Sequence, residues 1–327
     1  MRIRVHLMFC LFLFIALSLF GIVRIGITAI IDHPALDAIR LGIIDGLIQD
    51  GLVLAQDFDF EFQSAQGNMS TALAIANHFN TDAFDIIVAI STPSAQACAN
   101  VIKSKPVVFS AATDPVAAGL ITALGKNPGN VVGVSDMTPV KTQIQLMQWV
   151  IPGLKRIGIM TNPGEANSTV LKEHAQAACS ELGLELIEVV GTNTSEMIAA
   201  LSAIVSTIDA IYIGTDNTAA SCIESLHRIA IAQKKPIVCA DISMSRSGGL
   251  IGYGFDYYAF GIDTSHIVSD IIRGKAPSEI ESRLIGPDSL QLLINLDYAA
   301  HIGLKIPETL LQRASFIIEN GVERELK

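Results

Sequence analysis

Short apolar runs alternate with longer stretches of helical apolar spacing along most of this 327-residue chain. In the first half, the short runs predict strands at 24–30, 58–64, 85–90, 106–112 and 131–136. The longer stretches predict helices at 34–51, 69–80, 93–102, 114–124 and 139–150. Short apolar strands that alternate with helices indicate a parallel sheet with helices on both faces.

The same pattern restarts after residue 150. It predicts strands at 156–161, 184–190, 210–214, 236–240 and 250–254, and helices at 166–182, 195–205, 218–233 and 257–273. The tail adds a strand at 290–296 and helices around 297–302 and 307–314. We therefore expect an α/β protein of two Rossmann-like lobes, joined by a hinge near 137–139 and separated by a ligand-binding cleft.

Four segments of the first half place small polar residues just before a proline that opens a helix. They read DHP (32–34), STP (91–93), TDP (113–115) and DMTP (136–139). Proline suits the first helical turn because its missing N–H is no loss there. The carboxyl edge of a parallel sheet is where ligands bind, and helix starts favour anions such as an amino-acid carboxylate. The repetition predicts one small-molecule site; for any single segment, ordinary helix capping is the alternative.

The candidate ligand-binding residues lie at these strand ends and at their counterparts in the second half. They are His33, Ser91, Thr92, Ala111, Thr113, Asp114, Asp136, Asn167, Asp216, Asn217 and Asp241. Hydroxyl and backbone N–H groups in the first lobe can hold a carboxylate, Asp216 can pair with an ammonium group, and His33 can donate to a ligand or stack on it. The aromatic residues of 253–258 either wall the cleft or pack the hinge.

The composition restricts the class of partner. Half of the residues are hydrophobic, which is enough for two buried cores. The 32 acidic residues exceed the 22 basic ones, giving a formal net charge of −10. A protein of this charge does not suit a nucleic-acid partner, so a small-molecule ligand is the better expectation.

Catalytic and metal-binding patterns are missing from the sequence. There is no G-x-S-x-G elbow, Walker loop or H-E-x-x-H motif, and the seven histidines are scattered. We therefore predict no catalytic residues, no metal site and no cofactor. The five cysteines form no C-x-x-C pair. Buried free thiols are expected, and a disulfide between Cys222 and Cys239 is the alternative in an oxidising compartment.

The first 23 residues have the pattern of an export signal. A short basic start is followed by an almost wholly apolar run from Leu7 to Val23. We expect cleavage, a mature fold that starts near Arg24, and a location in the periplasm or at the extracytoplasmic face of the membrane. The alternative is an uncleaved anchor, because the run is nearly long enough to span a bilayer.

Seven ordered motifs between residues 24 and 313 resemble the ABC transporter substrate-binding protein family that includes tryptophan- and other aromatic amino-acid-binding members. They read DHPALD (32–37), STPSAQA (91–97), TDPV (113–116), SDMTPV (135–140), EANS (165–168), TDNT (215–218) and YGFDYY (253–258). The resemblance implies a type I periplasmic-binding-protein fold with three crossovers. It also implies a lobe of 24–137 with about 257–282, and a lobe of 138–256 with part of 283–327.

The resemblance also implies a function. The protein would capture a small solute, an amino acid and in particular an aromatic one, and deliver it as a monomer to an ABC permease driven by an ATPase. Ser91, Thr92, Ala111 and Thr113 would hold the ligand carboxylate, and Asp216 with Asn167 the amino group. Many relatives carry a lipid-attached cysteine after the signal, but Cys10 lies within the apolar run without the expected context.

Two other classes of protein remain as alternatives. A two-lobed Rossmann-like enzyme such as a transferase predicts turnover and a nucleotide site, for which the sequence offers no phosphate loop. A ligand-sensing receptor domain predicts an attached output domain or a separate sensor partner.

Overall fold

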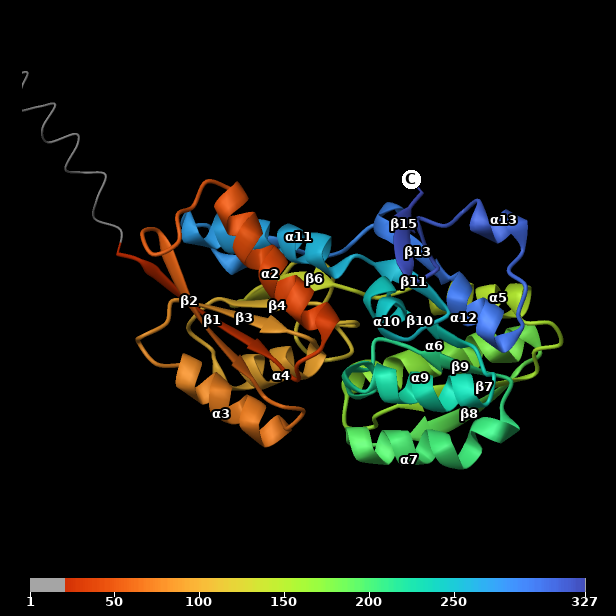
Figure 1. Ribbon diagram of the computed structural model, residues 1–327. Helices are drawn as coiled ribbons and strands as arrows, with labels where there is room; N and C mark the ends of the chain where they lie inside the picture. Colours follow the sequence, from red (N-terminus) through yellow and green to blue (C-terminus); the bar gives the residue numbers. More distant parts are fainter. Residues whose placement is uncertain (1–20, 327) are drawn as a thin grey trace, which may run out of the picture.

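The computed structural model describes residues 21–326 of the protein and shows two lobes, each built on its own sheet (Figure 1). Within these residues, the first sheet has the strand order β2-β1-β3-β4-β6-β12-β5 and the second has the order β15-β14-β13-β11-β10-β9-β7-β8. The expected signal segment lies outside the described residues, except for its last three positions. The predicted α/β class is confirmed.

The first lobe is a parallel sheet covered on both faces. Its strands are β1 (Val23–Ala29), β2 (Phe58–Ser64), β3 (Ile86–Ile90), β4 (Val107–Ser110), β6 (Val131–Ser135) and β12 (Glu281–Leu284), with the short antiparallel β5 (Gly125–Lys126) at the edge. Helices α3 (Met69–Phe79) and α4 (Thr92–Val101) cover one face, while α2 (Pro34–Gln49) and α11 (Tyr257–Ile272) pair on the other (Figure 1).

The second lobe repeats this plan. Its parallel strands are β7 (Arg156–Thr161), β8 (Glu185–Val190), β9 (Ala210–Ile213), β10 (Ile237–Cys239) and β11 (Ile251–Phe255). The sheet is extended beyond β11 by β13 (Leu290–Asn295), which is antiparallel to β11, and then by β14 (Phe316–Glu319) and β15 (Val322–Glu325). The helices are α5 (Val140–Val150), α6 (Ala166–Leu182), α7 (Thr194–Ile204), α8 (Asn217–Ser221), α9 (Ile223–Ala232), α10 (Ile242–Ser247), α12 (Leu296–Ile302) and α13 (Glu308–Leu311).

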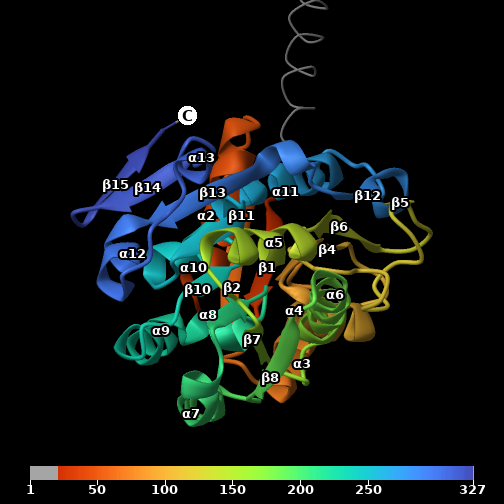
Figure 2. The ribbon, with the colours of Figure 1, turned by 90° about the vertical axis from the view of Figure 1, so that its right-hand side faces the viewer.

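The described chain passes between the lobes three times. It crosses from β6 to α5, from β11 to α11, and from β12 to β13. Figure 2 views the molecule with the second lobe in front of the first. Since parallel strands end at one edge of each sheet, the loops after them are well placed to form a site between the lobes.

Each lobe encloses an apolar core of its own. The five residues of β3 are all buried, as expected for a central strand covered by helices on both faces. Helices α2 and α11 approach closely because glycines face each other. A Cβ at Gly42 would lie 2.2 Å from the Tyr258 carbonyl oxygen, and one at Gly261 would lie 2.2 Å from that of Ile39.

Two of the predicted helices are wrong, since one is not a helix and the other is divided in two. The predicted helix 114–124 is a set of turns, in which Asp114 Oδ1 accepts the N–H groups of Val116 and Ala117 (3.1 and 2.9 Å) and Gly119 has a φ of +73°. The predicted helix 218–233 is two helices, α8 and α9, which meet at Cys222. Short elements that the sequence analysis did not predict are α10, β5, β12, β14 and β15.

The cysteines in the described part of the chain are Cys98, Cys179, Cys222 and Cys239, and all four are buried free thiols. This outcome agrees with the main expectation and excludes a bond between Cys222 and Cys239 in this structure. None of the helices within residues 21–326 is both long and apolar enough to cross a membrane.

Candidate functional site

A cavity between the lobes lies at the carboxyl ends of their strands. Its lining comprises His33, Ala35, Leu36, Thr92, Ala111, Thr113, Asp136 and Tyr257 from the first lobe and its hinge, and Asn167, Thr215, Asp216, Asn217, Ala220, Asp241 and Met244 from the second. The space between these side chains, including the mouth, is about 340 Å³, but only about 20 Å³ can take the centre of a water molecule. The cavity is therefore narrow, and the lobes are close together.

Nine of the eleven predicted site residues line this cavity. They are His33, Thr92, Ala111, Thr113, Asp136, Asn167, Asp216, Asn217 and Asp241. Within the described chain, Ser91 and Asp114 lie outside the lining. The Ser91 hydroxyl is buried against Ser94 Oγ at 3.5 Å, and Asp114 holds the turn that follows it.

The first-lobe side of the cavity presents hydroxyl groups at the start of α4. Thr92 Oγ1 accepts the N–H of Thr113 (3.1 Å), which leaves the Thr92 hydroxyl proton free to be donated elsewhere. In the described structure, Ser91 at the N-cap of α4 makes no side-chain cap bond, so its side chain does not satisfy the free N–H groups at the start of the helix. The α4 N-terminus adds the positive end of a helix dipole, and the whole arrangement suits a carboxylate.

Backbone strain marks the same two strand ends. Ser91 has a φ of 82° and Ala111 a φ of 56°, and both are non-glycine residues that rarely adopt such values. Conformations of this kind cost about 1–3 kcal/mol each and persist only where the surrounding structure imposes them. Here they set the direction of the chain as it enters Thr92 and Thr113.

Asp216 is held by the loops of the second lobe. Its Oδ1 accepts the N–H of Ala219 (2.8 Å) as the N-cap of α8, and its Oδ2 accepts the N–H of Asn162 (2.7 Å). Burial raises the pKa of Asp216, and the nearby charge of Glu165 raises it further. Asp216 therefore lines the cavity and also fixes two loops in place.

Glu165 supports this arrangement from behind. Its carboxylate accepts the backbone N–H groups of Asn217 and Thr218 (both 3.2 Å) and the side-chain amide of Asn167 (3.1 Å). These bonds orient Asn167 and Asn217, both of which line the cavity.

Asp136 and Asp241 add two further buried carboxylates from opposite sides. Asp136 Oδ2 accepts the Tyr257 hydroxyl (2.7 Å), while its Oδ1 is buried without a hydrogen-bond partner among the described residues. Burial raises the pKa of Asp136 and brings that of Asp241 to about 7. Asp241 Oδ1 caps α10 through the N–H of Met244 (2.8 Å).

The described lining has no Lys or Arg to balance these three acids. His33 cannot do so, because burial lowers its pKa to about 4 and leaves the ring neutral at physiological pH. Its Nε2 also has no partner in the part of the chain that the structure describes. The cavity therefore has several polar groups that lack a partner and an excess of acid.

Several residues that build the site were not among those predicted from the sequence. Tyr257, Thr215 and Glu165 lay within quoted motifs but were not selected, because their roles depend on contacts between distant segments. Met244 gave no signal, since α10 was not predicted. Among residues 21–326, no group of three or more His, Cys, Asp or Glu side chains is arranged to hold a metal ion.

Comparisons with known proteins place this site in context. The family model described as ABC transporter substrate binding protein matches residues 24–318. A tyrosine-binding protein from Clostridioides difficile (strain R20291) is 34% identical over 274 residues, covering 84% of this chain and 79% of that protein. These matches are to binding proteins rather than to enzymes.

Two solved structures add information on shape. An ABC domain from Streptococcus pneumoniae in complex with L-Trp is 30% identical, with a TM-score of 0.87 over 91% of this chain and 100% of that one. The ligand-free, open structure of a substrate-binding protein with adhesive properties from Clostridium difficile is 34% identical, with a TM-score of 0.67 over 91% and 99%. The open protein is more similar in sequence but less similar in shape, so the lobes here are arranged more like those of the complex.

More distant solute-binding proteins, at 15 and 16% identity, share the fold. The type I periplasmic-binding-protein fold expected from the sequence is therefore confirmed.

Proposed function

The chain belongs to the family of ABC transporter substrate-binding proteins, and from that premise we propose that it captures an aromatic amino acid in the cavity between its lobes. One observation carries the proposal: the cavity combines groups that suit an anion with groups that suit a cation. Hydroxyl groups and a helix start lie on the first-lobe side, and buried carboxylates without a basic partner lie around the remainder.

An α-amino acid matches this distribution because it carries both charges on neighbouring groups. Its carboxylate fits the α4 N-terminus beside Thr92 and Thr113. We assign its ammonium group to Asp241 and the unpaired oxygen of Asp136. This replaces the Asp216 and Asn167 that the resemblance implied, because both carboxylate oxygens of Asp216 already accept backbone N–H groups. Each charge would then be paired in the closed cavity, which offsets the cost of removing it from water.

Apolar lining on both sides supports an aromatic side chain. Leu36 and Ala35 come from α2, and Met244 comes from α10. A methionine sulfur packs favourably against an aromatic ring. The relatives point the same way, since one is a tyrosine-binding protein and another was solved with L-Trp.

The family supports a proposal for the rest of the function. We infer that the protein acts outside the cytoplasm as a monomer, exported by its apolar N-terminal segment. We also infer that it delivers its ligand to a membrane permease powered by an ATPase.

Titration calorimetry on residues 24–327 tests the ligand. Trp, Tyr and Phe are titrated alongside Ala and Leu, after the protein has been unfolded and refolded to remove any carried-over ligand. Selective binding of one or more aromatic amino acids is expected. A flat response to all five, from protein shown to be folded, would overturn the proposal.

Asp241→Asn tests the ammonium site in the same assay. Asparagine is also a good N-cap, so α10 keeps its start while the cavity loses one negative charge. The expected loss of affinity is about 30- to 150-fold, the effect of about 2–3 kcal/mol for a buried charged hydrogen bond. Asp114→Asn is the matched control, because Asp114 also caps a turn but lies outside the cavity lining. Equal affinities in the two variants would remove Asp241 from the site.

A further inference from the structure

Helix α10 carries two residues of the cavity on a short element. Asp241 is its N-cap, and Met244 lies in its first turn. The helix also packs against α2 of the first lobe, so it belongs to the surface on which the lobes meet. A shift of this six-residue helix would move a buried carboxylate, an apolar wall and an interlobe contact together.

The other end of α10 is fastened to the C-terminal hairpin of β14 and β15. Arg246 Nε donates to both carboxylate oxygens of Glu323 (3.1 and 2.9 Å), and Arg246 Nη2 donates to Oε1 (2.7 Å). The same guanidinium lies over the Phe316 ring, 5.2 Å from its centroid. Two parallel hydrogen bonds from a guanidinium to a carboxylate fix the orientation of the two groups as well as their distance. The contact with the aromatic ring restricts the guanidinium further.

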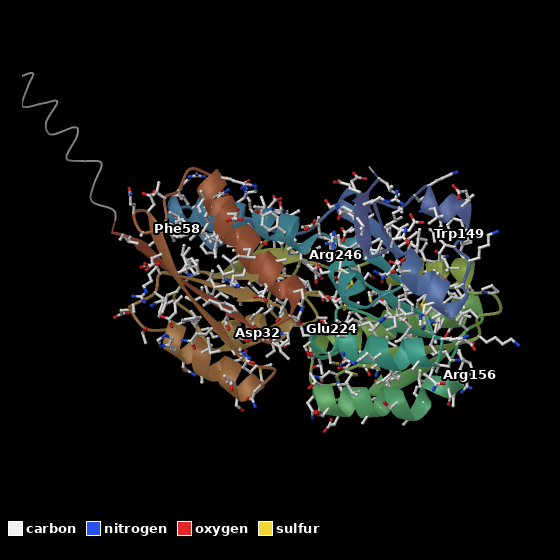
Figure 3. All side chains as sticks on the ribbon, viewed as in Figure 1. Asp32, Phe58, Trp149, Arg156, Glu224 and Arg246 are labelled. Carbon is white, nitrogen blue, oxygen red and sulfur yellow. The ribbon has the colours of Figure 1, made fainter. Side chains whose placement is uncertain are left out.

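The Arg246–Glu323 ion pair is partly buried and lies near the surface between the lobes. Both side chains are about one-third exposed, and Figure 3 shows Arg246 on the side of the second lobe that faces the first. Glu323 also lies beyond residue 318, where the match to the family ends.

We propose that the Arg246–Glu323 pair is a positioning device for the ligand site, through which the C-terminal hairpin holds α10 and thereby Asp241 and Met244. Arg246 and Glu323 themselves do not line the cavity in the described structure. The proposal rests on the proposed function only in taking this cavity as the ligand site.

Loss of Glu323 would have two consequences for the site. The last turn of α10 would lose its ion pair to the hairpin, which is the only ion pair between these elements among the described residues. Arg246 would also be released, and the other charges that act on it are those of Asp256 and Asp241. Both effects would disturb the cavity without removing any group that touches the ligand.

Hydrogen exchange of the full chain without ligand is the first test. In Glu323→Gln, amides of 242–247 should exchange at least several-fold faster, including the Met244 N–H that Asp241 accepts, while those of α7 remain unchanged. Glu319→Gln is the matched control, because Glu319 pairs with Arg324 within the same hairpin and, among the described residues, makes no hydrogen bond or ion pair to α10. Unchanged exchange in Glu323→Gln, or equal acceleration in Glu319→Gln, would overturn the proposal. This readout needs no ligand, so it stands apart from failure of the amino-acid proposal.

Ligand affinity is the second test, with the amino acid that the unmodified protein binds. Glu323→Gln and Arg246→Gln should each weaken binding about three- to tenfold, and the double variant no more than either alone, because both remove one shared interaction. Glu323→Asp, which keeps the charge, should recover part of the loss. Additive losses, or no recovery in Glu323→Asp, would contradict a positioning role.

Discussion

Asp136, Asp216 and Asp241 place three carboxylates in a narrow cavity whose described lining supplies no cation. Desolvation is the largest cause that raises the pKa of each, and hydrogen bonds to the carboxylates only partly oppose it. In the closed protein without ligand, protons are the available means of neutralising this charge. A ligand ammonium group would replace some of these protons, so binding and protonation should be linked.

The sign of this linkage gives a prediction. The ammonium group binds deprotonated Asp241, whose pKa is about 7 in the folded protein. Affinity should therefore rise as pH increases from about 5 to 7, by up to about tenfold per pH unit for each proton displaced, and then level off. Calorimetry in buffers of different ionisation enthalpy will count the protons released.

The unliganded protein should show the opposite trend. The folded state holds protons that the unfolded state has lost between about pH 4 and 7, so its free energy of unfolding should fall as pH rises through that window. Asp241→Asn should flatten both profiles. An affinity that stays constant between pH 5 and 8 would show that no carboxylate proton is displaced.

Single residues were predictable where the strand ends alone identified them. Thr92, Thr113, Asp136 and Asp241 follow apolar runs, and the parallel sheet brings such positions to one edge. Glu165 was not selected, because its importance comes from donors up to 53 positions away in the sequence. A contact of that range leaves no mark in local spacing.

At the scale of elements, the close pair of α2 and α11 joins the start of the first lobe to the segment that returns to it after β11. Gly42 and Gly261 allow the two backbones to approach, and the Tyr258 hydroxyl donates to Asp45 across the same pair (2.8 Å). The first residues of α2 line the cavity, so this packing also holds part of the site.

Gly42→Ala should destabilise the protein. The new methyl group would meet the Tyr258 carbonyl oxygen at 2.2 Å, so the helices must move apart. The expected loss is about 1–3 kcal/mol in the free energy of unfolding, as for other overpacked sites. Urea unfolding followed by circular dichroism measures it. Gly286→Ala is the control, since nothing lies within 4 Å of its Cβ position; a wild-type midpoint in Gly42→Ala would show that the helices tolerate separation.

Elements were predictable where apolar spacing was long and regular, as in α2 and α6. The predicted helix 114–124 failed because Asp114 satisfies the N–H groups of a turn and Gly119 adopts a left-handed conformation. Helix α10 was missed because it is six residues long and serine-rich. Such elements depend on tertiary contacts, here with Glu323, more than on their own propensity.

At the scale of the whole molecule, closure of the lobes determines whether the residues on the two sides of the cavity can contact one ligand. The shape is nearer to the solved L-Trp complex than to the open, ligand-free relative. One hydrogen bond spans the cleft directly within the lining: Thr113 Oγ1 and Thr215 Oγ1 are 2.9 Å apart, with either as donor. This bond forms only when the lobes meet, so it contributes to the closed state and not to the open one.

Thr215→Val should therefore weaken ligand binding without unfolding the protein. Valine keeps the shape of the side chain but leaves the Thr113 hydroxyl without its interlobe partner, which costs about 0.5–1.5 kcal/mol and corresponds to roughly two- to tenfold in affinity. Thr215→Ser keeps the hydroxyl and should bind nearly as well as the unmodified protein.

Small-angle scattering will show whether closure is the cause. Without ligand, Thr215→Val should have a larger radius of gyration than Thr215→Ser, and saturating ligand should bring the two together, because binding energy restores the closed population. Equal radii in the absence of ligand, combined with weaker binding, would mean that Thr215 acts on the ligand directly. Equal affinities in both variants would show that the interlobe hydrogen bond makes no net contribution to closure.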